Sequence, residues 1–276
     1  MAVLISGDFH AGANNELSTI SKKTLVKEYG QENFDKIHYH IILGDCGFMR
    51  QGNEKTDRFN YKTLAFRPFP ILCVQGNHDP IYGIKNLHET DIGIGENVYQ
   101  INDVPFTAYL KRGKIYTIDG IKFLVLGGAL SVDKDIRVPN KTWWENEYWS
   151  EKEKHDLFKL LEQDNSFDNV VSHTGPRFVN NILFSGFSSF HEKSSDEVAI
   201  LNNEIHEKIH FTEWSCGHWH SDRYWYDDIS SHSFRYFYRT TKIIEKTNNE
   251  LFFLNKDVHA NDDHSCDFYV PEELKR

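Results

Sequence analysis

Apolar residues in the first third of this chain fall into three short runs, and each run ends in a polar turn that contains glycine. Runs of this length without polar interruption predict strands that are buried on both faces. Helical patterns over residues 14–30 and 58–66 separate the runs. Because strands that alternate with helices pair in parallel through right-handed crossovers, this region predicts a parallel sheet. The predicted strands and their turns are residues 2–6 with Gly7-Asp8, 37–43 with Gly44-Asp45, and 69–74 with Gly76-Asn77-His78-Asp79.

The remainder of the chain mixes both kinds of strand pairing. Residues 106–118 and 121–128 alternate like antiparallel strands around Asp119-Gly120, a dipeptide typical of tight hairpin turns. Two helices, two strands and a terminal hairpin are expected after it. They are a helix over 150–163 with Ser150 and Glu153 as a capping box, a strand ending at His173, a helix over 194–209 capped by Ser194 or Ser195, a strand over 211–217, and a hairpin of 234–244 with 251–254.

These elements predict an α/β (α+β) fold with two mixed sheets packed face to face and helices outside them. The expected architecture is therefore a four-layer β-sandwich of two mixed sheets flanked by helices. With 276 residues and neither an internal repeat nor a clear linker, the chain can bury one large core. We expect a single domain over residues 1–255, and a polar C-terminal tail over residues 256–276.

Charge bears on the partners that the protein can bind. The formal net charge is −10, whereas nonspecific binding of nucleic acid depends on neutralising phosphates with lysine and arginine. Nucleic acid is therefore not the favoured partner. Bound divalent cations would add local positive charge, so the overall charge does not exclude a phosphate substrate.

Apolar stretches and cysteine spacing indicate the compartment. No stretch approaches the roughly 18 apolar residues of a membrane span, and residues 1–6 lack a basic signal region, so we expect no membrane partner. The cysteines form no CxxC pair, which favours reduced, buried thiols and a cytoplasmic location. They are Cys46, Cys73, Cys216 and Cys266.

Candidate metal ligands follow five of the predicted strands. Because ligands of open α/β sheets gather beyond the carboxyl ends of strands, these five ends can converge on one point. Carboxylate, imidazole and amide together suit manganese, iron or zinc, and the absence of thiolate argues against a structural zinc site. The clusters are Asp8-Phe9-His10, Gly44-Asp45, Gly76-Asn77-His78-Asp79, Ser172-His173 and Gly217-His218-Trp219-His220.

In their order, and over nearly the entire chain, these clusters resemble the signature of the calcineurin-like metallophosphoesterase superfamily: D-x-H, GD, GNH[DE], H and GHxH. The family fold is a β-sandwich of two mixed sheets flanked by helices, in agreement with the strand pattern. The resemblance implies two divalent metal ions, for which we expect manganese, with iron or zinc as alternatives. It assigns one metal to Asp8, His10, Asp45 and His220, and the other to Asp45, Asn77, His173 and His218, with Asp45 as the bridge.

The resemblance also implies a reaction, the hydrolysis of a phosphomonoester or small phosphodiester, with a nucleotide as one candidate. A pair of metal ions lowers the pKa of a shared water so that hydroxide can attack phosphorus. His78 is the expected catalytic residue beside the metals. Two positions depart from the phosphoprotein phosphatases of this family. Asp79 replaces a glutamate, which leaves the partner of His78 open, and Arg50 lies one place beyond the expected phosphate-binding arginine.

Two alternatives stay open: a manganese-dependent nuclease of the same superfamily, and a binding module that has kept the fold without catalysis. The aromatic stretch Trp143–Trp149 bears on the first, because its rings could stack on bases, although filling the core is the more common role of such rings. Trp219, between two predicted ligands, is expected to pack in the core. The sequence leaves the physiological substrate and the oligomeric state open.

Overall fold

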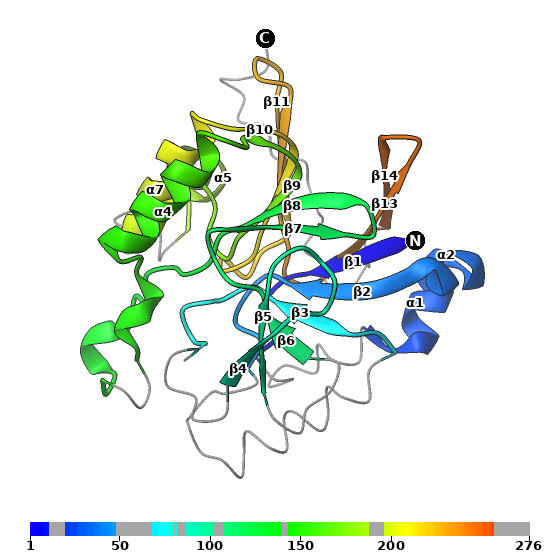
Figure 1. Cartoon of the computed structure of the whole chain (residues 1–276), viewed down its shortest axis with the longest axis horizontal. Helices are drawn as coiled ribbons and strands as arrows, with labels where there is room; N and C mark the ends of the chain where they lie inside the picture. Colours follow the sequence, from blue (N-terminus) through cyan, green and yellow to red (C-terminus); the bar gives the residue numbers. More distant parts are fainter. Residues whose placement is uncertain are drawn as a thin grey trace.

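Two mixed sheets packed face to face form the centre of this computed structural model, and helices lie outside them (Figure 1). The structure describes residues 1–10, 20–47, 68–79, 81, 87–101, 107–139, 143–187 and 196–256. The larger sheet has the order β14 (Glu250–Lys256), β13 (Thr241–Thr247), β1 (Ala2–Ser6), β2 (Ile37–Ile42), β3 (Ile71–Cys73), β6 (Thr107–Tyr109), β5 (Val98–Ile101) and β4 (Leu87–Thr90). The smaller has the order β11 (Arg223–Asp227), β12 (His232–Tyr236), β10 (His210–Cys216), β9 (Ser166–Val171), β8 (Ile121–Val125) and β7 (Lys114–Ile118).

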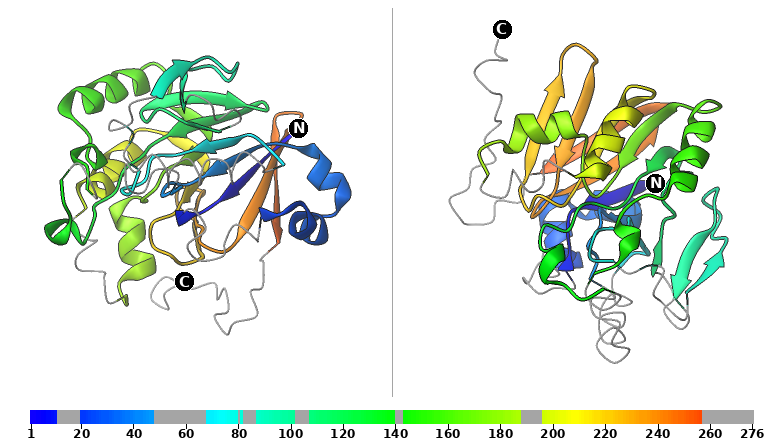
Figure 2. Two further views of the ribbon diagram at one scale, coloured as in Figure 1. Left: turned by 90° about the horizontal axis from the view of Figure 1, so that it is seen from below. Right: turned by 90° about the vertical axis from the view of Figure 1, so that its left-hand side faces the viewer.

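The helices form two separate groups, which stay apart in the views of Figure 2. One group packs on the larger sheet and consists of α1 (Lys22–Tyr29) and α2 (Gln31–Lys36). The other packs on the smaller sheet and consists of α4 (Glu151–Leu161), α5 (Arg177–Phe184) and α7 (Glu197–His206). The order helix, sheet, sheet, helix confirms the predicted four-layer sandwich.

Three clusters of apolar side chains fill the spaces between these four layers of helices and sheets. Val3 and Ile5 of β1 face the smaller sheet, whereas Ala2 and Leu4 face α1 and α2. A strand covered on both faces needs apolar side chains at every position, because both sides exclude water. This explains why residues 2–5 form an uninterrupted apolar run, which leads through the buried Ser6 to the polar turn.

The register of the parallel strands brings their carboxyl ends to the same edge. In the larger sheet, β2 pairs in parallel with both β1 and β3, and Ile42 lies opposite Ser6 on one side and Cys73 on the other. In the smaller sheet, β9 pairs in parallel with both β8 and β10. The predicted ligand turns follow β1, β2, β3, β9 and β10, so they emerge together.

Several predicted boundaries need correction. Residues 106–118 are not one strand, since β6 belongs to the larger sheet and β7 to the smaller. Likewise, the segment 234–244 divides into β12 and β13, which lie in different sheets, and only β13 forms the hairpin with β14. The cap of α7 is Asp196, whose side chain accepts from the N–H of Val198, rather than Ser194 or Ser195. Elements absent from the prediction are α2, β4, β5, α5 and β11.

Other predictions are confirmed or lie outside the described part. The β7–β8 hairpin turns at Asp119-Gly120, and Ser150 with Glu153 forms the capping box of α4. The helix predicted over 58–66 and the tail after residue 256 fall on residues that the structure does not describe. Among the described helices, none combines the length and the apolar character that crossing a bilayer requires.

A buried ion pair links the two sheets. Lys242 on β13 is 1% exposed, Glu213 on β10 is 2% exposed, and Lys242 Nζ lies 2.5 Å from Glu213 Oε2. Arg235 Nε on β12 lies 3.7 Å from the same oxygen. Burial lowers the pKa of Lys242 to about 8, although Glu213 opposes this effect. Glu213 therefore stabilises the charged form of the buried Lys242.

We expect Glu213→Ala to lower the free energy of unfolding by about 3–5 kcal/mol, because it leaves a buried ammonium group without its counter-charge. The double variant Glu213→Leu, Lys242→Met should recover most of this loss, since it replaces the pair with apolar side chains. Urea unfolding of the three proteins measures both effects. A loss below about 1 kcal/mol in Glu213→Ala, the range of exposed ion pairs, would contradict this account.

Candidate metal centre

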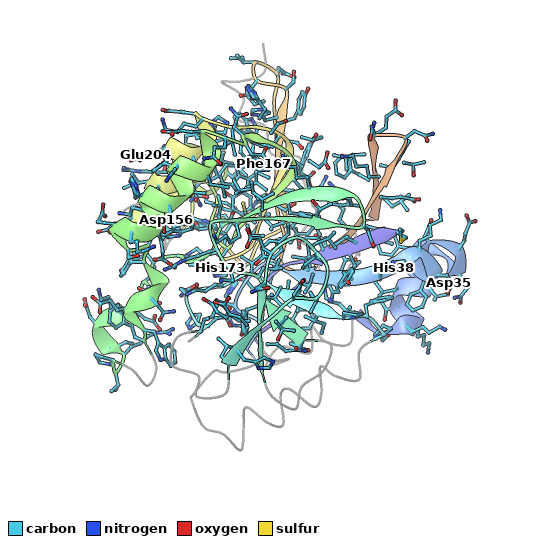
Figure 3. The ribbon with its side chains drawn as sticks, viewed as in Figure 1. Asp35, His38, Asp156, Phe167, His173 and Glu204 are labelled. Carbon is cyan, nitrogen blue, oxygen red and sulfur yellow. The ribbon has the colours of Figure 1, made fainter. Side chains whose placement is uncertain are left out.

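The predicted ligands lie together where the strand ends of both sheets meet, and Figure 3 labels His173 near the middle of the molecule. Asp8, His10 and His220 make one group, in which one ligand atom from each lies within 4.8 Å of the others. Asp8 Oδ2 is 3.1 Å from His220 Nε2, and His10 Nε2 is 3.0 Å from His220 Nε2. Asp8 is buried, whereas His220 is 47% exposed, so this group reaches the surface.

Asp45, Asn77, His173 and His218 form the adjoining group. His173 is its centre: Nε2 lies 2.9 Å from Asn77 Oδ1 and 3.4 Å from Asp45 Oδ2, and the His218 ring centroid is 4.9 Å away. Two further distances join the groups, 3.6 Å from His173 Nδ1 to Asp8 Oδ1 and 4.0 Å from His10 Nε2 to Asp45 Oδ2. The structure thus brings all seven predicted ligands into one continuous cluster.

The buried carboxylates of the cluster favour the binding of a cation. Burial alone would favour a neutral His173, but Asp45 and Asp8 outweigh it and raise the pKa of His173 to about 9. Protonated His173 donates from Nδ1 to the carbonyl of Leu43 at 2.8 Å and from Nε2 to Asn77 Oδ1. Because metal ligands bind in deprotonated form, a divalent cation can take the place of this proton. The donor set therefore fits metal ions.

Backbone strain concentrates at the same residues. His10, Asp45, His218 and His220 have φ values of 44°, 49°, 69° and 49°. Residues other than glycine rarely adopt this left-handed backbone conformation, and residues that do so cluster at functional sites. In the described part of the chain, the other non-glycine residues with positive φ are Asp119, Ser231, Asn248 and Asn249.

Glycines allow the ligand segments to approach one another. A Cβ atom on Gly76 would lie 2.1 Å from Asp45 Oδ1 and 2.3 Å from the Asp45 backbone nitrogen. A Cβ atom on Gly217 would lie 2.2 Å from Asp8 Oδ1. The first residue of the third cluster and of the fifth cluster must therefore be glycine, because a carboxylate from another strand end occupies the space of a Cβ atom.

A chain of buried hydrogen bonds orients the Asn77 amide. Asn77 Nδ2 donates to Ser131 Oγ at 3.0 Å, and Ser131 Oγ donates to Glu147 Oε2 at 2.6 Å. Because the single hydroxyl hydrogen of Ser131 goes to the carboxylate, its oxygen must accept from the amide nitrogen. Asn77 Oδ1 consequently faces the ligand cluster, which is the orientation a metal ion needs.

The aromatic stretch supplies Glu147 and is largely buried. Trp144 and Trp149 are buried, and Trp149 Nε1 donates to the carbonyl of Gly127 at 2.8 Å. Arg112 donates to the carbonyls of Asn146 and Tyr148, which flank Glu147, at 2.9 and 2.8 Å. Core packing is therefore the role of Trp144 and Trp149. Trp219 also packs as predicted, stacked on Phe184 with ring centroids 4.3 Å apart.

The partner of His78, which the sequence leaves open, is Arg137. Arg137 Nη1 lies 2.6 Å from His78 Nδ1 and Nη2 lies 3.2 Å from His78 Nε2, while His78 Nε2 lies 3.8 Å from Asp45 Oδ2. Burial lowers the pKa of His78; Asp45 opposes this shift and Arg137 adds to it. The lowered pKa favours the neutral form of His78, which lies between a carboxylate and a guanidinium.

Asp79 braces the turn instead of holding His78. Its carboxylate accepts from the Gly76 N–H at 2.8 Å and from the Tyr109 hydroxyl at 3.2 Å. Burial, together with the charge of Asp45, raises the pKa of Asp79 to about 7. Arg50, which lies one place beyond the expected phosphate-binding arginine, is outside the described residues.

Ser131, Glu147 and Arg137 are the site residues that sequence reasoning missed. One signal could have indicated Ser131: it follows β8, and the end of β8 lies beside the end of β9. Strand-end placement therefore applies to Gly127–Ser131 as it does to the five recognised clusters. No local sequence pattern distinguishes Arg137 from the other arginines of the chain.

A family model described as calcineurin-like phosphoesterase matches residues 1–222, most of this 276-residue chain. The chain belongs to this family. The matched region contains the seven predicted ligands and His78, and it confirms the superfamily predicted from the order of the motifs. A search of curated proteins found no match to this phosphoesterase.

Solved structures that are similar to this phosphoesterase have low sequence identity to it. One solved chain is 10% identical, with 92% of this chain and 99% of that chain covered and a TM-score of 0.54. The phosphopantetheinyl hydrolase PptH from Mycobacterium tuberculosis is 13% identical, with 86% and 90% covered and a TM-score of 0.49. A chain named as a 5′-nucleotidase from Staphylococcus aureus is 12% identical, with a TM-score of 0.47; 99% of this chain is covered but 56% of that chain.

We expect Gly76→Ala to lower the free energy of unfolding of this phosphoesterase by about 1–3 kcal/mol or more, because the new methyl group overlaps Asp45. Gly186→Ala is the matched control, since a Cβ atom there meets nothing within 4 Å. Thermal unfolding of both variants measures the difference. Equal melting temperatures for Gly76→Ala and the control would show that the close approach carries no cost.

Removal of the Ser131 hydroxyl should weaken metal binding about 10- to 100-fold, the usual effect of losing a partner that orients a ligand. Ser131→Ala leaves the Asn77 nitrogen without its acceptor, so the amide is free to rotate. Titration of the metal-free protein with Mn²⁺ measures the affinity, with Ser230→Ala in the β11–β12 turn as the control. Wild-type affinity in Ser131→Ala would refute the orienting role.

Proposed function

We propose that this phosphoesterase hydrolyses a phosphomonoester or a small phosphodiester, with a nucleotide as one candidate, and that it uses two divalent metal ions. The observation that carries the proposal is the single cluster that seven predicted ligands form around the buried carboxylates of Asp8 and Asp45. Manganese is the expected metal, with iron or zinc as alternatives, because carboxylate, imidazole and amide ligands suit all three.

The two groups of side chains support the assignment of ligands. Asp8, His10 and His220 with Asp45 would hold one ion, and Asp45 with Asn77, His173 and His218 the other. Asp45 is suited to bridge because its Oδ2 lies within 4.0 Å of a nitrogen in both groups, His10 Nε2 and His173 Nε2. When bound, the metals would supply an activated water as nucleophile and positive charge for the phosphoryl oxygens.

His78 would assist departure of the leaving group. The shorter Arg137 contact, at 2.6 Å, makes Nδ1 of neutral His78 the acceptor, so the ring hydrogen lies on Nε2, on the side of Asp45. An N–H in this position can donate to the leaving oxygen and transfer its proton as the bond to phosphorus breaks. Because His78 is 27% exposed at its side chain, substrate can approach it.

Charge and thiols support the proposed substrate class and location. The net charge of −10 disfavours a long polyanion relative to a small ester that the metal centre can bind by itself. The described cysteines, Cys46, Cys73 and Cys216, are free and buried, as expected of a protein in the reducing cytoplasm.

The proposed activity is tested by loading metal-free protein with Mn²⁺, Fe²⁺ or Zn²⁺. We expect hydrolysis of p-nitrophenyl phosphate or bis-p-nitrophenyl phosphate after loading, and its loss on chelation. Single-stranded DNA and a panel of nucleotides are assayed in parallel. Cleavage of oligonucleotide alone would point to a nuclease, and bound metal without any hydrolysis would point to a binding module.

His78→Gln should lower kcat about 10²- to 10⁴-fold while metal content stays unchanged, since His78 contributes a proton and not a ligand. His38→Gln is the matched control. His38 is partly exposed on β2, and Figure 3 shows it well away from His173. Steady-state kinetics with metal analysis separates the two effects. Full turnover in His78→Gln across the pH range would exclude the proposed role.

A further inference from the structure

The segment from Ser131 to Pro139 contacts the candidate centre at two points. It forms part of the green loop that lies beneath α4 in Figure 1. Ser131 accepts from the Asn77 amide at one end, and the guanidinium of Arg137 lies against His78 at the other. Between them, Lys134–Ile136 forms the 3-10 helix η4, and the Arg137 N–H donates to the carbonyl of Lys134 at 3.1 Å. A hydrogen-bonded turn therefore connects the two points of contact.

The guanidinium of Arg137 is held in place by a carboxylate on its far side. Arg137 Nε lies 2.6 Å from Asp133 Oδ1, one helical turn earlier in the same segment. The side chain of Arg137 is 14% exposed, so most of it is packed and only a small part reaches solvent. Because Nε is engaged by Asp133, the two terminal nitrogens point toward His78.

Both terminal nitrogens of Arg137 lie against the ring of His78, Nη1 at 2.6 Å from Nδ1 and Nη2 at 3.2 Å from Nε2. A guanidinium has donors only and keeps its positive charge, so an anion is the ligand that it binds most strongly. Because His78 Nε2 also lies 3.8 Å from Asp45 Oδ2, the guanidinium is placed beside the proposed metal position.

A phosphoryl group fits this position in charge and in shape. A guanidinium presents a planar fork of N–H groups that matches two oxygens of one phosphate, and its charge persists at all physiological pH values. His78 Nε2, which Arg137 Nη2 approaches, is 3.8 Å from the carboxylate proposed to bridge the metals. A phosphate bound at the centre would therefore lie within reach of Arg137.

We propose that Arg137 is a substrate-binding residue that donates to the non-bridging phosphoryl oxygens through its terminal nitrogens, while Asp133 holds it in position. This inference rests on the proposed function. It assigns to Arg137, from the loop after β8, the contact for which the sequence offered Arg50. On substrate binding, the terminal nitrogens form charge-assisted hydrogen bonds to the phosphoryl oxygens.

The test compares Arg137→Gln with wild type in the Mn²⁺-loaded full chain. We expect the inhibition constant of inorganic phosphate to rise about 10- to 100-fold and kcat/KM for p-nitrophenyl phosphate to fall by a similar factor, as for the loss of a charge-assisted hydrogen bond. Metal content and melting temperature should stay as in wild type. Ile136→Ala is the control, because Ile136 is the neighbouring residue and is 86% exposed.

A purely structural role gives a different result. If Arg137 only held His78 in place, kcat would fall while the inhibition constant of phosphate stayed within twofold of wild type, and this outcome overturns the proposal. Should Arg137→Gln fail to fold, Arg137→Lys is measured in the same way. Lysine keeps the charge but lacks the planar fork, so an unchanged inhibition constant in that variant also overturns the proposal.

Failure of the proposed function is recognised separately. If wild type hydrolyses no ester, calorimetric titration of the Mn²⁺-loaded protein with inorganic phosphate replaces the inhibition constant. Weaker binding by Arg137→Gln would then support the phosphate contact although the proposed reaction is wrong. Equal binding by both proteins, or no binding by wild type, would overturn the inference about Arg137.

Discussion

Two carboxylates excluded from water at the meeting point of the sheets impose the constraint on which the rest of this structure depends. A buried charge is tolerated only when hydrogen bonds and opposite charge compensate for the lost hydration. Asp8 Oδ1 accepts from the backbone N–H of His218 at 2.8 Å, and Asp45 Oδ1 accepts from the backbone N–H of His78 at 2.9 Å. Each carboxylate thus binds the turn that follows another strand. The strand ends are joined by the same groups that would hold the metals.

The sandwich makes this arrangement possible because it brings strand ends of two sheets to one edge. Neither sheet alone supplies the full set: Asp8, Asp45 and Asn77 follow strands of the larger sheet, and His173 and His218 follow strands of the smaller. Apolar packing on both faces of each sheet fixes the distance between the strand-end edges of the two sheets. The ligand side chains are therefore held near one another by the fold. The strained backbone at Asp45 and His218 is then maintained by the packing around it.

How much could be predicted from the sequence depends on whether a feature is local. Strands β1 and β3 are buried along their whole length, and their apolar runs with polar turns are visible in the residue order. Pairing between distant segments is not. Residues 121–128 predict a hairpin arm, but the parallel pairing of Val125 with Val171 joins positions far apart in the chain. The run 234–244 looks continuous, and only its division between two sheets shows that it is two strands.

The partners of the ligands escaped prediction for a related reason. The sequence shows that Asp79 follows His78, but not that its carboxylate points back to Gly76. Glu147 lies in an aromatic stretch whose composition suggests packing, and its role appears only through Ser131. Side-chain direction is set by tertiary contacts, so the types of residue at the site were predictable while the hydrogen bonds that orient them were not.

The segment that carries both Ser131 and Arg137 has a thermodynamic consequence. At one end Ser131 contacts Asn77, which is proposed to bind metal, and at the other end the segment carries Arg137, which is proposed to bind the phosphoryl group. Loading the metal would order the segment at one end and so reduce the entropy lost when an anion orders the other. Such linkage is reciprocal: if bound metal raises the affinity for the anion, then bound anion raises the affinity for the metal by the same factor. An inhibitor that mimics phosphate would thereby also raise the affinity of the protein for the cations.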